Sequence, residues 1–360
     1  MRFGGAIVNL EDFGYCDWQR EALNHCNGDE SHLARITAVD RDRYMIGSRV
    51  GAVPAEATGK LLYCAQTLED VPCVGDWVLV DYLDNNEHAV IHDVLPRKTI
   101  LRRRAPGEKS EYQPIAANID VAFIVQSCDV DFSMNRLDRY IVMANDGGIA
   151  SILLLTKSDF VDKTMAEGLI SEVKRNHSLE VIAISGATGA GFDELARTLE
   201  KGKTYCLIGS SGVGKSTILN RLLGKEEFAT GSVREKSGKG RHTTTRRQLV
   251  ALENRALFVD TPGMRELGLM AFGAGLEESF QDIAVAAGEC RYADCTHTGE
   301  KGCGILAMVE AGQLSEERYA SYLKLLKESK HYEMSYLERR KRDRAFGKMV
   351  KNYGKFDQKR

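Results

Sequence analysis

The feature that most constrains the fold is the segment GSSGVGKST at residues 209–217. The apolar run TYCLI precedes it and ILNRLL follows it, which predicts a strand, a glycine-rich loop and a helix in that order. Loops of this kind wrap phosphate groups with backbone N–H groups and connect a strand of a parallel sheet to a helix. A glycine-rich turn with a chance lysine is the alternative, but it does not account for the flanking elements.

Each part of this loop has an expected role toward a nucleotide. Gly209 and Gly214 permit the curled backbone, Lys215 reaches the β- and γ-phosphate oxygens, and Ser216 offers its hydroxyl to Mg²⁺. We therefore expect the phosphates to contact the whole loop, which consists of Gly209, Ser210, Ser211, Gly212, Val213, Gly214, Lys215, Ser216 and Thr217.

A second phosphate-site motif, FVDTPG, follows at residues 258–263. Its Asp260 is expected to bind Mg²⁺ through water, and the Gly263 N–H to meet the γ-phosphate. Between the two motifs, GKGRHTTTRRQL at residues 238–249 has little apolar surface to bury. One threonine of Thr243–Thr245, with Thr244 as the first candidate, is expected to complete the Mg²⁺ shell when nucleotide orders this segment.

A guanine-binding motif is predicted at the end of the run LLLTKSDF, residues 153–160. The Asp159 carboxylate can accept hydrogen bonds from guanine N1–H and N2–H₂, which adenine lacks, while the Lys157 stem lies over the ring. A loop that begins SGATG follows the next apolar run, and a backbone N–H of Ser185, Gly186 or Ala187 is expected to meet guanine O6. Together the two loops favour GTP over ATP.

The order of these motifs is unusual for a GTPase. The base motif and its loop precede the phosphate loop, whereas ordinary GTPases begin with the phosphate loop. A circular permutation accounts for this order, because chain termini that lie close together can be rejoined without changing the site. The short apolar runs at residues 121–127, 150–157, 181–185, 204–209 and 256–261, with helices after Ser133, Phe192 and Lys215, predict the doubly wound sheet that such a domain needs.

The region before the nucleotide-binding motifs has a different sequence pattern. Five β-rich runs separated by turn residues, at 33–40, 43–50, 59–66, 75–83 and 87–95, predict a small closed barrel of the OB type. The following PRKTILRRR brings together five basic residues: Arg97, Lys98, Arg102, Arg103 and Arg104. Such a run is either a solvated face or a nucleic-acid contact, and the sequence leaves both open.

A cysteine-rich segment follows the nucleotide-binding region. Cys290, Cys295, His297 and Cys303 supply three thiolates and one imidazole, a full tetrahedral set for a structural Zn²⁺ ion. Four unligated Cys and His residues are the alternative. The other six cysteines are scattered singly, which is typical of core thiols in a reducing compartment.

We expect a multidomain α/β protein in the cytoplasm, since the apolar runs are too short for a bilayer and no signal peptide is apparent. The net charge of −2 excludes a general attraction to nucleic acid, so any RNA contact has to be local. The expected parts are an N-terminal extension (1–32), an OB-fold RNA-binding domain (33–104), a linker (105–117), a circularly permuted GTPase domain (118–272), a helical zinc-binding domain (273–335) and a basic tail (336–360).

The motifs TKSD, SGATG, GSSGVGKST, GRHTTT and DTPGMRE, with GDWV before them and CRYADCTHTGEKGC after them, resemble those of the RsgA family, also called YjeQ or YloQ. The resemblance covers residues 33–330 and implies a GTPase stimulated by the small (30S) ribosomal subunit. It also implies contacts of the OB and zinc domains with 16S rRNA during late subunit maturation, with one Zn²⁺ and GTP-bound Mg²⁺ as cofactors. We expect a monomer that does not bind membranes.

Two residues depart from the usual GTPase pattern. Thr156 stands where an Asn amide commonly ties the base loop to the phosphate loop, so we expect weaker guanine binding. Met264 stands where many GTPases have a Gln that orients water, and a thioether cannot do so. Intrinsic hydrolysis is therefore expected to be slow, with His242 as the candidate that completes the catalytic site beside Lys215 and Gly263.

Two other functions stay open at this stage. A P-loop alone permits an ATP-dependent kinase, although the Lys157 and Asp159 pair argues against it. A nucleotide-regulated RNA-binding module, in which hydrolysis matters little, also fits a barrel followed by a basic run.

Overall fold

The computed structural model describes residues 9–40, 43–104, 112–129, 131–224, 247–260 and 274–330. The chain forms two compact units, the first of residues 1–102 and 113–267 and the second of residues 103–112 and 268–360. Within the described ranges, no helix combines the length and the apolar character needed to cross a bilayer.

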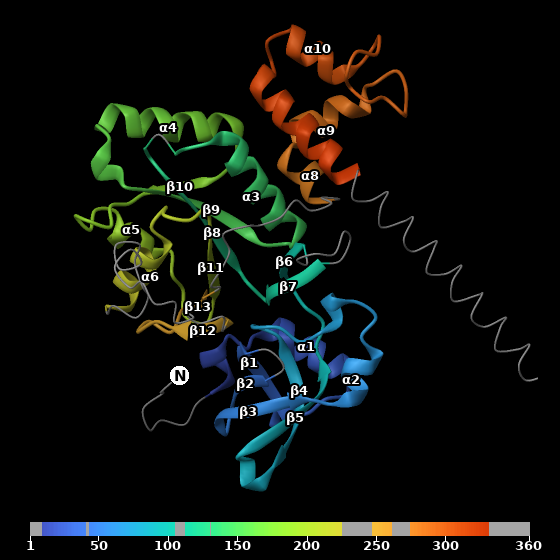
Figure 1. Cartoon of the computed structure of the whole chain (residues 1–360), viewed down its shortest axis with the longest axis vertical. Helices are drawn as coiled ribbons and strands as arrows, with labels where there is room; N and C mark the ends of the chain where they lie inside the picture. The colour runs from blue at the N-terminus through green and yellow to red at the C-terminus, as the bar shows by residue number, and fades with distance from the viewer. Residues whose placement is uncertain are drawn as a thin grey trace, which may run out of the picture. The chain divides into compact units, whose positions relative to one another are not determined.

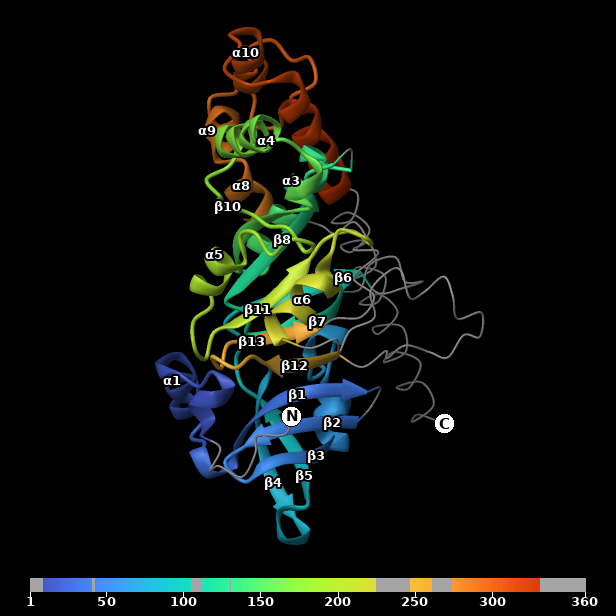
Figure 2. The same ribbon diagram turned by 90° about the vertical axis from the view of Figure 1, so that its left-hand side faces the viewer.

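The first unit is organised by one mixed sheet that runs through two domains (Figures 1 and 2). In the described part of the chain this sheet has eleven strands in the order β10-β9-β8-β11-β13-β12-β1-β2-β3-β5-β4. Its strands are β1 (Leu33–Asp40), β2 (Arg43–Ser48), β3 (Gly51–Ala57), β4 (Trp77–Leu83), β5 (His88–Val94), β8 (Val121–Ser127), β9 (Ala150–Thr156), β10 (Glu180–Ala183), β11 (Thr204–Ile208), β12 (Arg247–Ala251) and β13 (Leu257–Asp260). A separate two-stranded sheet pairs β6 (Ile100–Arg104) with β7 (Tyr112–Ala117).

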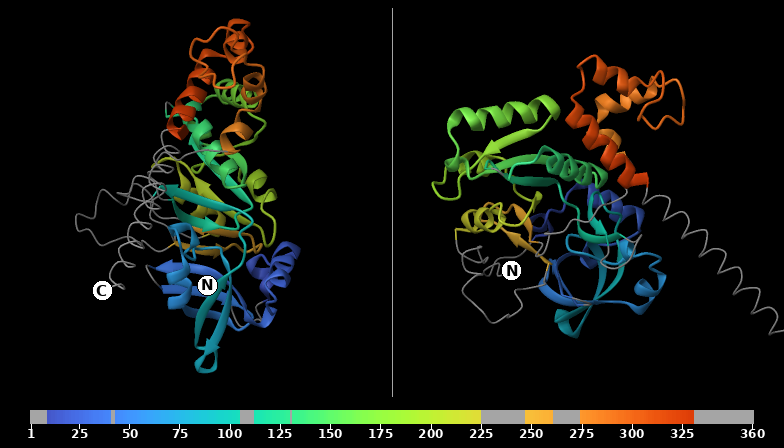
Figure 3. Two further views of the ribbon diagram at one scale, coloured as in Figure 1. Left: turned by 90° about the vertical axis from the view of Figure 1, so that its right-hand side faces the viewer. Right: turned by 45° about the horizontal axis from the view of Figure 1, so that its top comes forward.

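Strands β1 to β5 close into a barrel, because β1 pairs with β4 as well as with β2 (Figure 3). All neighbours are antiparallel except β3 and β5, which run parallel. The inward-facing side chains form an apolar core that includes Ile36, Ile46, Val78 and Ile91, each less than 1% exposed. The predicted OB-type barrel is confirmed.

One predicted barrel strand is wrong. Residues 59–66 do not form a strand: α2 (Gly59–Cys64) occupies this position, and the third strand is β3, immediately before it. The Thr58 side chain accepts a hydrogen bond from the Leu61 N–H and so caps the start of α2. β3 escaped prediction because its only buried side chains, Val53 and Ala55, are small and flank a proline.

The nucleotide-binding domain is the doubly wound sheet that the sequence predicts. Strands β8, β9, β10, β11 and β13 are parallel, while β12 is antiparallel to β13. Leu195 of α5 (Phe192–Arg197) and Ile218 of α6 (Lys215–Leu223) join the core on one face, and α3 (Met134–Asp146) contacts β8 and β9 on the other (Figure 1). Helix α4 (Lys163–Asn176) links β9 to β10.

Three stacked aromatic rings hold the centre of this sheet together. Phe123 of β8, Tyr205 of β11 and Phe258 of β13 have ring centroids 5.4 to 6.1 Å apart and interplanar angles of 11 to 24°. The phosphate loop follows β11, the middle strand of the three. The strand that carries the loop is thus held on both sides by extensive ring contact.

The N-terminal segment packs on the barrel instead of extending from it. Leu10 and Phe13 of the 3₁₀ turn Leu10–Phe13 and Leu23 of helix α1 (Asp17–His25) share an apolar cluster with the barrel residue Trp77. A second 3₁₀ turn, Glu30–His32, leads into β1. Two further 3₁₀ turns, Leu68–Asp70 and Asp84–Asn86, connect barrel strands.

Arg35 joins the N-terminal segment, the barrel and the nucleotide-binding domain. Its guanidinium is buried and donates to the carbonyl oxygens of Gly75 (3.1 Å), Asn118 (3.0 Å) and Phe13. It also lies 5.7 Å from the ring centroid of Trp77. Burial lowers the pKa of Arg35 to about 10, which still leaves it charged at neutral pH.

Basic residues of the run after the barrel form ion pairs with acidic residues of the same chain. Arg97 makes a two-bond ion pair with the fully buried Asp76, at 2.7 Å for each bond. Arg102 pairs with Asp146 (2.7 Å) and with Glu69 (3.0 Å). These two arginines therefore do not form a freely solvated face, because carboxylates distant in sequence pair with them, whereas the nucleic-acid contact stays a prediction.

The second unit is helical. Its described elements are α8 (Ala274–Ser279), α9 (Gln281–Gly288), α10 (Gly304–Glu310) and a helix over residues 316–330. Phe280 packs edge-on against Tyr322 at 5.5 Å, and Arg318 lies 4.7 Å from the Phe280 ring while pairing with Asp282. The basic tail predicted at 336–360 lies outside the described residues.

Arg35→Met should destabilise the first unit, because it keeps an apolar stem but removes a donor from the buried carbonyl oxygens of Phe13, Gly75 and Asn118, of which that of Gly75 keeps the Asn118 side-chain amide. We expect the free energy of unfolding to fall by about 3 kcal/mol or more, since each unsatisfied buried group costs roughly 1–3 kcal/mol. Urea unfolding followed by circular dichroism measures this. Arg43→Met, at an exposed position of β2, is the control and should stay within about 0.5 kcal/mol of the parent. Equal unfolding of the two variants would contradict the role of Arg35.

Candidate functional site

The phosphate loop lies at the carboxyl end of β11, between that strand and α6. Gly209 has φ 155° and Gly214 has φ 102°, and a Cβ atom on Gly209 would lie 2.4 Å from the Val125 carbonyl oxygen. The loop therefore requires glycine at these positions. The Lys215 ammonium donates to the carbonyl oxygens of Gly209 (2.6 Å) and Ser210, so it folds back over its own loop.

Thr156 connects the base motif to the phosphate loop. It ends β9 and is buried, and its hydroxyl donates to the Val213 carbonyl oxygen at 2.7 Å. We expected the base loop and the phosphate loop to lose their connection without an Asn amide. This is wrong, since the Thr156 hydroxyl makes a hydrogen bond to the phosphate loop. This removes the stated reason for weaker guanine binding, whereas the affinity itself stays a prediction.

Lys157 is held by an acidic residue that the sequence analysis missed. Its backbone is left-handed (φ 57°), and its ammonium lies 2.8 Å from a carboxylate oxygen of Asp129. The Ser127 hydroxyl donates to the same carboxylate at 2.7 Å. The hydrogen bond from Lys157 is the largest cause that lowers the pKa of Asp129 to about 2. An acid directly after a parallel strand was the available signal, because the carboxyl ends of such strands meet at one edge.

The loop after β10 contacts the phosphate-loop helix, as the predicted base site requires. The Arg221 guanidinium donates to the Gly186 carbonyl oxygen at 2.9 Å, and a Cβ atom on Gly186 would lie 2.8 Å from the Thr217 methyl group. Ser185 is buried, and its hydroxyl accepts the Thr188 N–H at 3.0 Å. The predicted loop of Ser185, Gly186 and Ala187 thus lies beside α6.

Asp159 lies in a 3₁₀ turn, Ser158–Phe160, directly after the base strand. Its carboxylate is exposed and makes no hydrogen bond to any residue that the structure describes. The Ser158 N–H donates to the Ile184 carbonyl oxygen at 3.2 Å, which joins the turn to the end of β10. Asp159 and the loop at Ser185 therefore belong to adjoining segments.

Asp260 ends β13, the parallel neighbour of β11, and so shares the sheet edge of Ser216 and the phosphate loop. It is half-buried, and burial raises its pKa to about 6. The other predicted phosphate-site residues, His242, Thr243–Thr245 with Thr244, Gly263 and Met264, lie outside the described residues. Arg136 of α3 was also missed, although its guanidinium lies 3.4 Å from the Ser210 hydroxyl.

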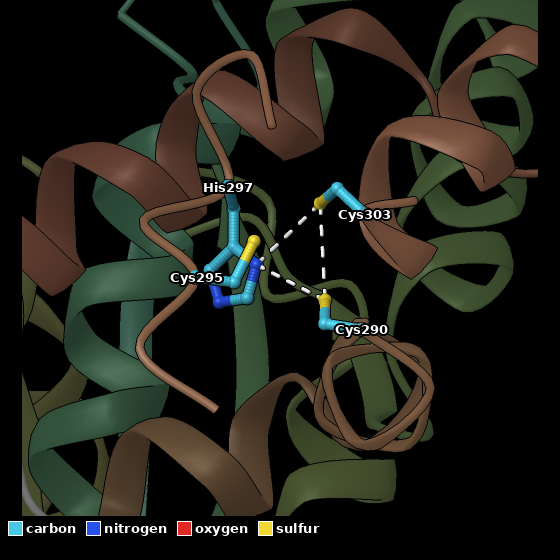
Figure 4. A group of neighbouring side chains, drawn as sticks. All are labelled: Cys290, Cys295, His297 and Cys303. Atoms are coloured by element: carbon cyan, nitrogen blue, oxygen red, sulfur yellow. Dashed lines mark hydrogen bonds between the residues drawn. The ribbon is translucent and has the colours of Figure 1, made fainter. Parts of the chain in front are cut away.

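The four predicted zinc ligands converge in the second unit (Figure 4). Their ligand atoms all lie within 4.8 Å of one another. The Sγ atoms of Cys290 and Cys303 are 3.9 Å apart, and His297 Nδ1 is 3.5 and 3.6 Å from them. A tetrahedral ion with Zn–S near 2.3 Å and Zn–N near 2.0–2.1 Å places two sulfurs about 3.8 Å apart and S and N about 3.5 Å apart. The separations among Cys290, His297 and Cys303 fit this geometry, with Cys295 in the same cluster.

Neighbouring groups orient the ligands. The Gly304 N–H donates to the Cys290 sulfur at 3.3 Å, and the Tyr319 hydroxyl donates to the His297 carbonyl oxygen at 2.6 Å. Glu300 accepts the backbone N–H groups of Thr296 and Thr298, which shapes the loop around His297. Such supporting hydrogen bonds are characteristic of metal sites.

The cysteines outside this cluster are not all core thiols. Cys73, Cys128 and Cys206 are buried, as expected, but Cys16, Cys26 and Cys64 are exposed. The prediction is therefore wrong for these three, because each of them lies in or beside a short surface helix.

Comparison with known proteins agrees with this arrangement. A family model described as RsgA GTPase matches residues 94–270. The small ribosomal subunit biogenesis GTPase RsgA 2 of Lactiplantibacillus plantarum is 40% identical over 342 residues, which cover 94% of this chain and 95% of that protein. The RsgA protein of Opitutus terrae is 38% identical over 331 residues, covering 89% and 90%.

Solved structures show the same fold. YjeQ from Thermotoga maritima superposes with a TM-score of 0.61 at 25% identity, covering 83% of this chain and 98% of that chain. YloQ, described as a circularly permuted GTPase, superposes with a TM-score of 0.59 at 22% identity, covering 83% and 95%. The permuted fold is thereby confirmed. Because relatives at 40% and 38% identity align over nearly the whole length of both chains, this chain belongs to the RsgA GTPase family.

Proposed function

We propose that this protein hydrolyses GTP to GDP and phosphate in the late maturation of the small (30S) ribosomal subunit, and that the subunit stimulates hydrolysis. The curated relatives carry the name of small ribosomal subunit biogenesis GTPases. One observation supports the nucleotide site most directly. The base strand and the phosphate loop, 57 residues apart in sequence, are joined by the hydrogen bond from Thr156 to Val213.

Guanine recognition is proposed to rest on Asp159 and on the loop at Ser185. The exposed Asp159 carboxylate offers two acceptors to guanine N1–H and N2–H₂. The Lys157 ammonium is anchored by Asp129, and its stem is proposed to lie over the base. A base without these N–H groups would leave the carboxylate unpaired, and this difference supplies the selectivity.

The phosphate side is proposed to work through backbone N–H groups and Lys215. When nucleotide enters, the Lys215 ammonium exchanges its bonds to loop carbonyls for phosphate oxygens, which are stronger acceptors. Ser216 and Asp260 are the described residues that would hold Mg²⁺, which neutralises phosphate charge when bound. The raised pKa of Asp260 fits this role, because a buried carboxylate is stabilised by a cation.

The roles of the residues outside the described ranges remain predictions. Thr244, Gly263 and His242 are proposed to complete the site around the γ-phosphate, with His242 acting in place of the Gln that Met264 replaces. The zinc domain and the barrel are proposed to contact 16S rRNA, with the chain acting as a monomer in the cytoplasm. The RNA-binding module without a catalytic role is the second candidate function.

The function is tested by measuring GTP turnover with and without purified small subunits. We expect slow turnover of the protein alone and a rise of at least roughly tenfold when subunits complete the site. Co-sedimentation with subunits in the presence of GDP or a non-hydrolysable GTP analogue should differ between the two nucleotides. Unstimulated turnover, together with RNA binding that ignores the nucleotide, would instead support the RNA-binding module.

Asp159→Asn should relax base selectivity. The amide replaces one acceptor by a donor, so we expect GTP affinity to fall by on the order of tenfold and xanthine nucleotides, which present an oxygen there, to bind better. Competition of GTP, XTP and ATP against a fluorescent nucleotide measures this. Asp193→Asn, at an exposed position of α5, is the matched control. An unchanged preference for guanine in Asp159→Asn would contradict the base assignment.

The cysteine cluster should hold about one zinc ion per chain, measured by elemental analysis of the purified protein. Cys295→Ser should lose this metal and part of the helical signal, because a structural zinc site contributes to folding. Cys64→Ser, at an exposed position of α2, is the control and should keep both. GTP binding should survive Cys295→Ser, since the nucleotide site lies in the other unit. Full metal content in Cys295→Ser would contradict the ligand assignment.

A further inference from the structure

A small cavity, lined mainly by polar and charged residues, lies at the edge of the sheet opposite to the nucleotide site. Its volume is about 230 Å³. Asp120 and Lys203, which line it, stand immediately before β8 and β11, whereas the phosphate loop follows β11. Because these strands are parallel, the cavity is at their amino ends. The remaining walls come from the N-terminal segment, including Tyr15 and Cys16.

The charges around this cavity do not balance. Four cationic side chains, Arg35, Lys98, Lys201 and Lys203, line it together with two carboxylates, Glu11 and Asp120, which leaves an excess of two positive charges. The ammonium groups of Lys98 and Lys203 lie 3.6 and 3.7 Å from the same oxygen of Asp120. The other oxygen of Asp120 accepts the Thr204 N–H at 2.8 Å. One carboxylate is thus shared by two lysines and a backbone donor.

Arg35 adds a buried cation to this wall. Its three hydrogen bonds go to backbone carbonyls and none goes to a carboxylate. The guanidinium has five N–H groups, so two of them are not used by these three bonds. A Cβ atom on Gly14 would lie 2.9 Å from Arg35 Nη1 and 2.5 Å from the Gly202 carbonyl oxygen. Gly14 therefore packs closely against both groups, and a side chain at this position would have to displace one of them.

We propose that this cavity binds the phosphate group of a small phosphorylated molecule. A phosphate monoester carries about −1.5 to −2 charges at neutral pH, which matches the excess on the walls. Lysine and arginine are the side chains that proteins use for such groups. The volume is below the roughly 300–1,000 Å³ of pockets for drug-sized ligands, which favours a small molecule over a nucleotide.

Such a ligand would bridge the N-terminal segment, the barrel and the nucleotide-binding domain, because all three supply walls. The site is separate from the nucleotide site and does not depend on the function proposed above. The proposal gives a role to Lys201 and Lys203, which precede β11 and take no part in the proposed GTP hydrolysis.

The exposed thiol of Cys16 provides a local probe. The full-length protein is saturated with GDP and Mg²⁺ to fill the phosphate loop, and alkylation by iodoacetamide is followed by mass spectrometry. Inorganic phosphate is the test ligand, with chloride at matched ionic strength as its control. We expect phosphate to slow the alkylation of Cys16, with half of the effect at a concentration on the order of 1 mM. Cys26, also exposed but not in the cavity wall, should react at an unchanged rate.

Substitutions then test the charges. Lys201→Gln, at an exposed position, should raise the half-effect concentration by on the order of tenfold, because a hydrogen bond to a charged group is lost. Lys203→Gln should act in the same direction. Lys163→Gln, on the exposed face of α4, is the control and should behave like the parent.

Three results would overturn the proposal. Equal slowing at Cys16 and Cys26 would mean a general effect of phosphate. Equal behaviour of Lys201→Gln, Lys203→Gln and Lys163→Gln would show that the cavity lysines do not bind the anion. Protection of Cys16 by a single-stranded RNA oligonucleotide at a lower phosphate concentration than by inorganic phosphate would identify a macromolecular ligand instead.

Discussion

The buried guanidinium of Arg35 is the interaction on which the first unit depends. It donates to carbonyl oxygens of Phe13, Gly75 and Asn118, which belong to the N-terminal segment, the barrel and the start of the nucleotide-binding domain. A charge without a carboxylate partner is costly to bury, so the site is stable only while all three carbonyls are in place. The two domains also share strand pairing, since Ala38 of β1 lies opposite Gln248 of β12. The barrel and the nucleotide-binding domain are therefore joined by one continuous sheet.

The continuous sheet also positions the residues of the nucleotide site. The phosphate loop, the base strand and Asp260 all stand at carboxyl ends of parallel strands, the edge at which doubly wound sheets bind ligands. Circular permutation leaves that edge intact, because it changes only where the chain begins. A link between the base motif and the phosphate loop is likewise kept, because the Thr156 hydroxyl makes it in place of the common Asn amide.

The partners of the charged residues were the feature least predictable from sequence. Arg97 and Arg102 lie in a basic run, yet their partners Asp76 and Asp146 are 21 and 44 residues away and lie in other elements. Similarly, Asp129 was overlooked although it holds Lys157. Composition reveals a cluster of like charge, but only the fold determines which opposite charges reach it. The same holds for the cavity before β11, whose walls come from three distant segments.

The sequence by itself determined the fold class, the permuted order of the motifs, the P-loop and the four-ligand cysteine cluster. These are local patterns in which a few residues at fixed spacing specify the backbone and its chemistry. Tertiary structure alone decided that Arg35 is buried, that Thr156 bonds to Val213 and that residues 59–64 form a helix before the fourth barrel strand. The reason is physical: burial and hydrogen-bond partners depend on contacts between segments far apart in the chain, which no local pattern contains.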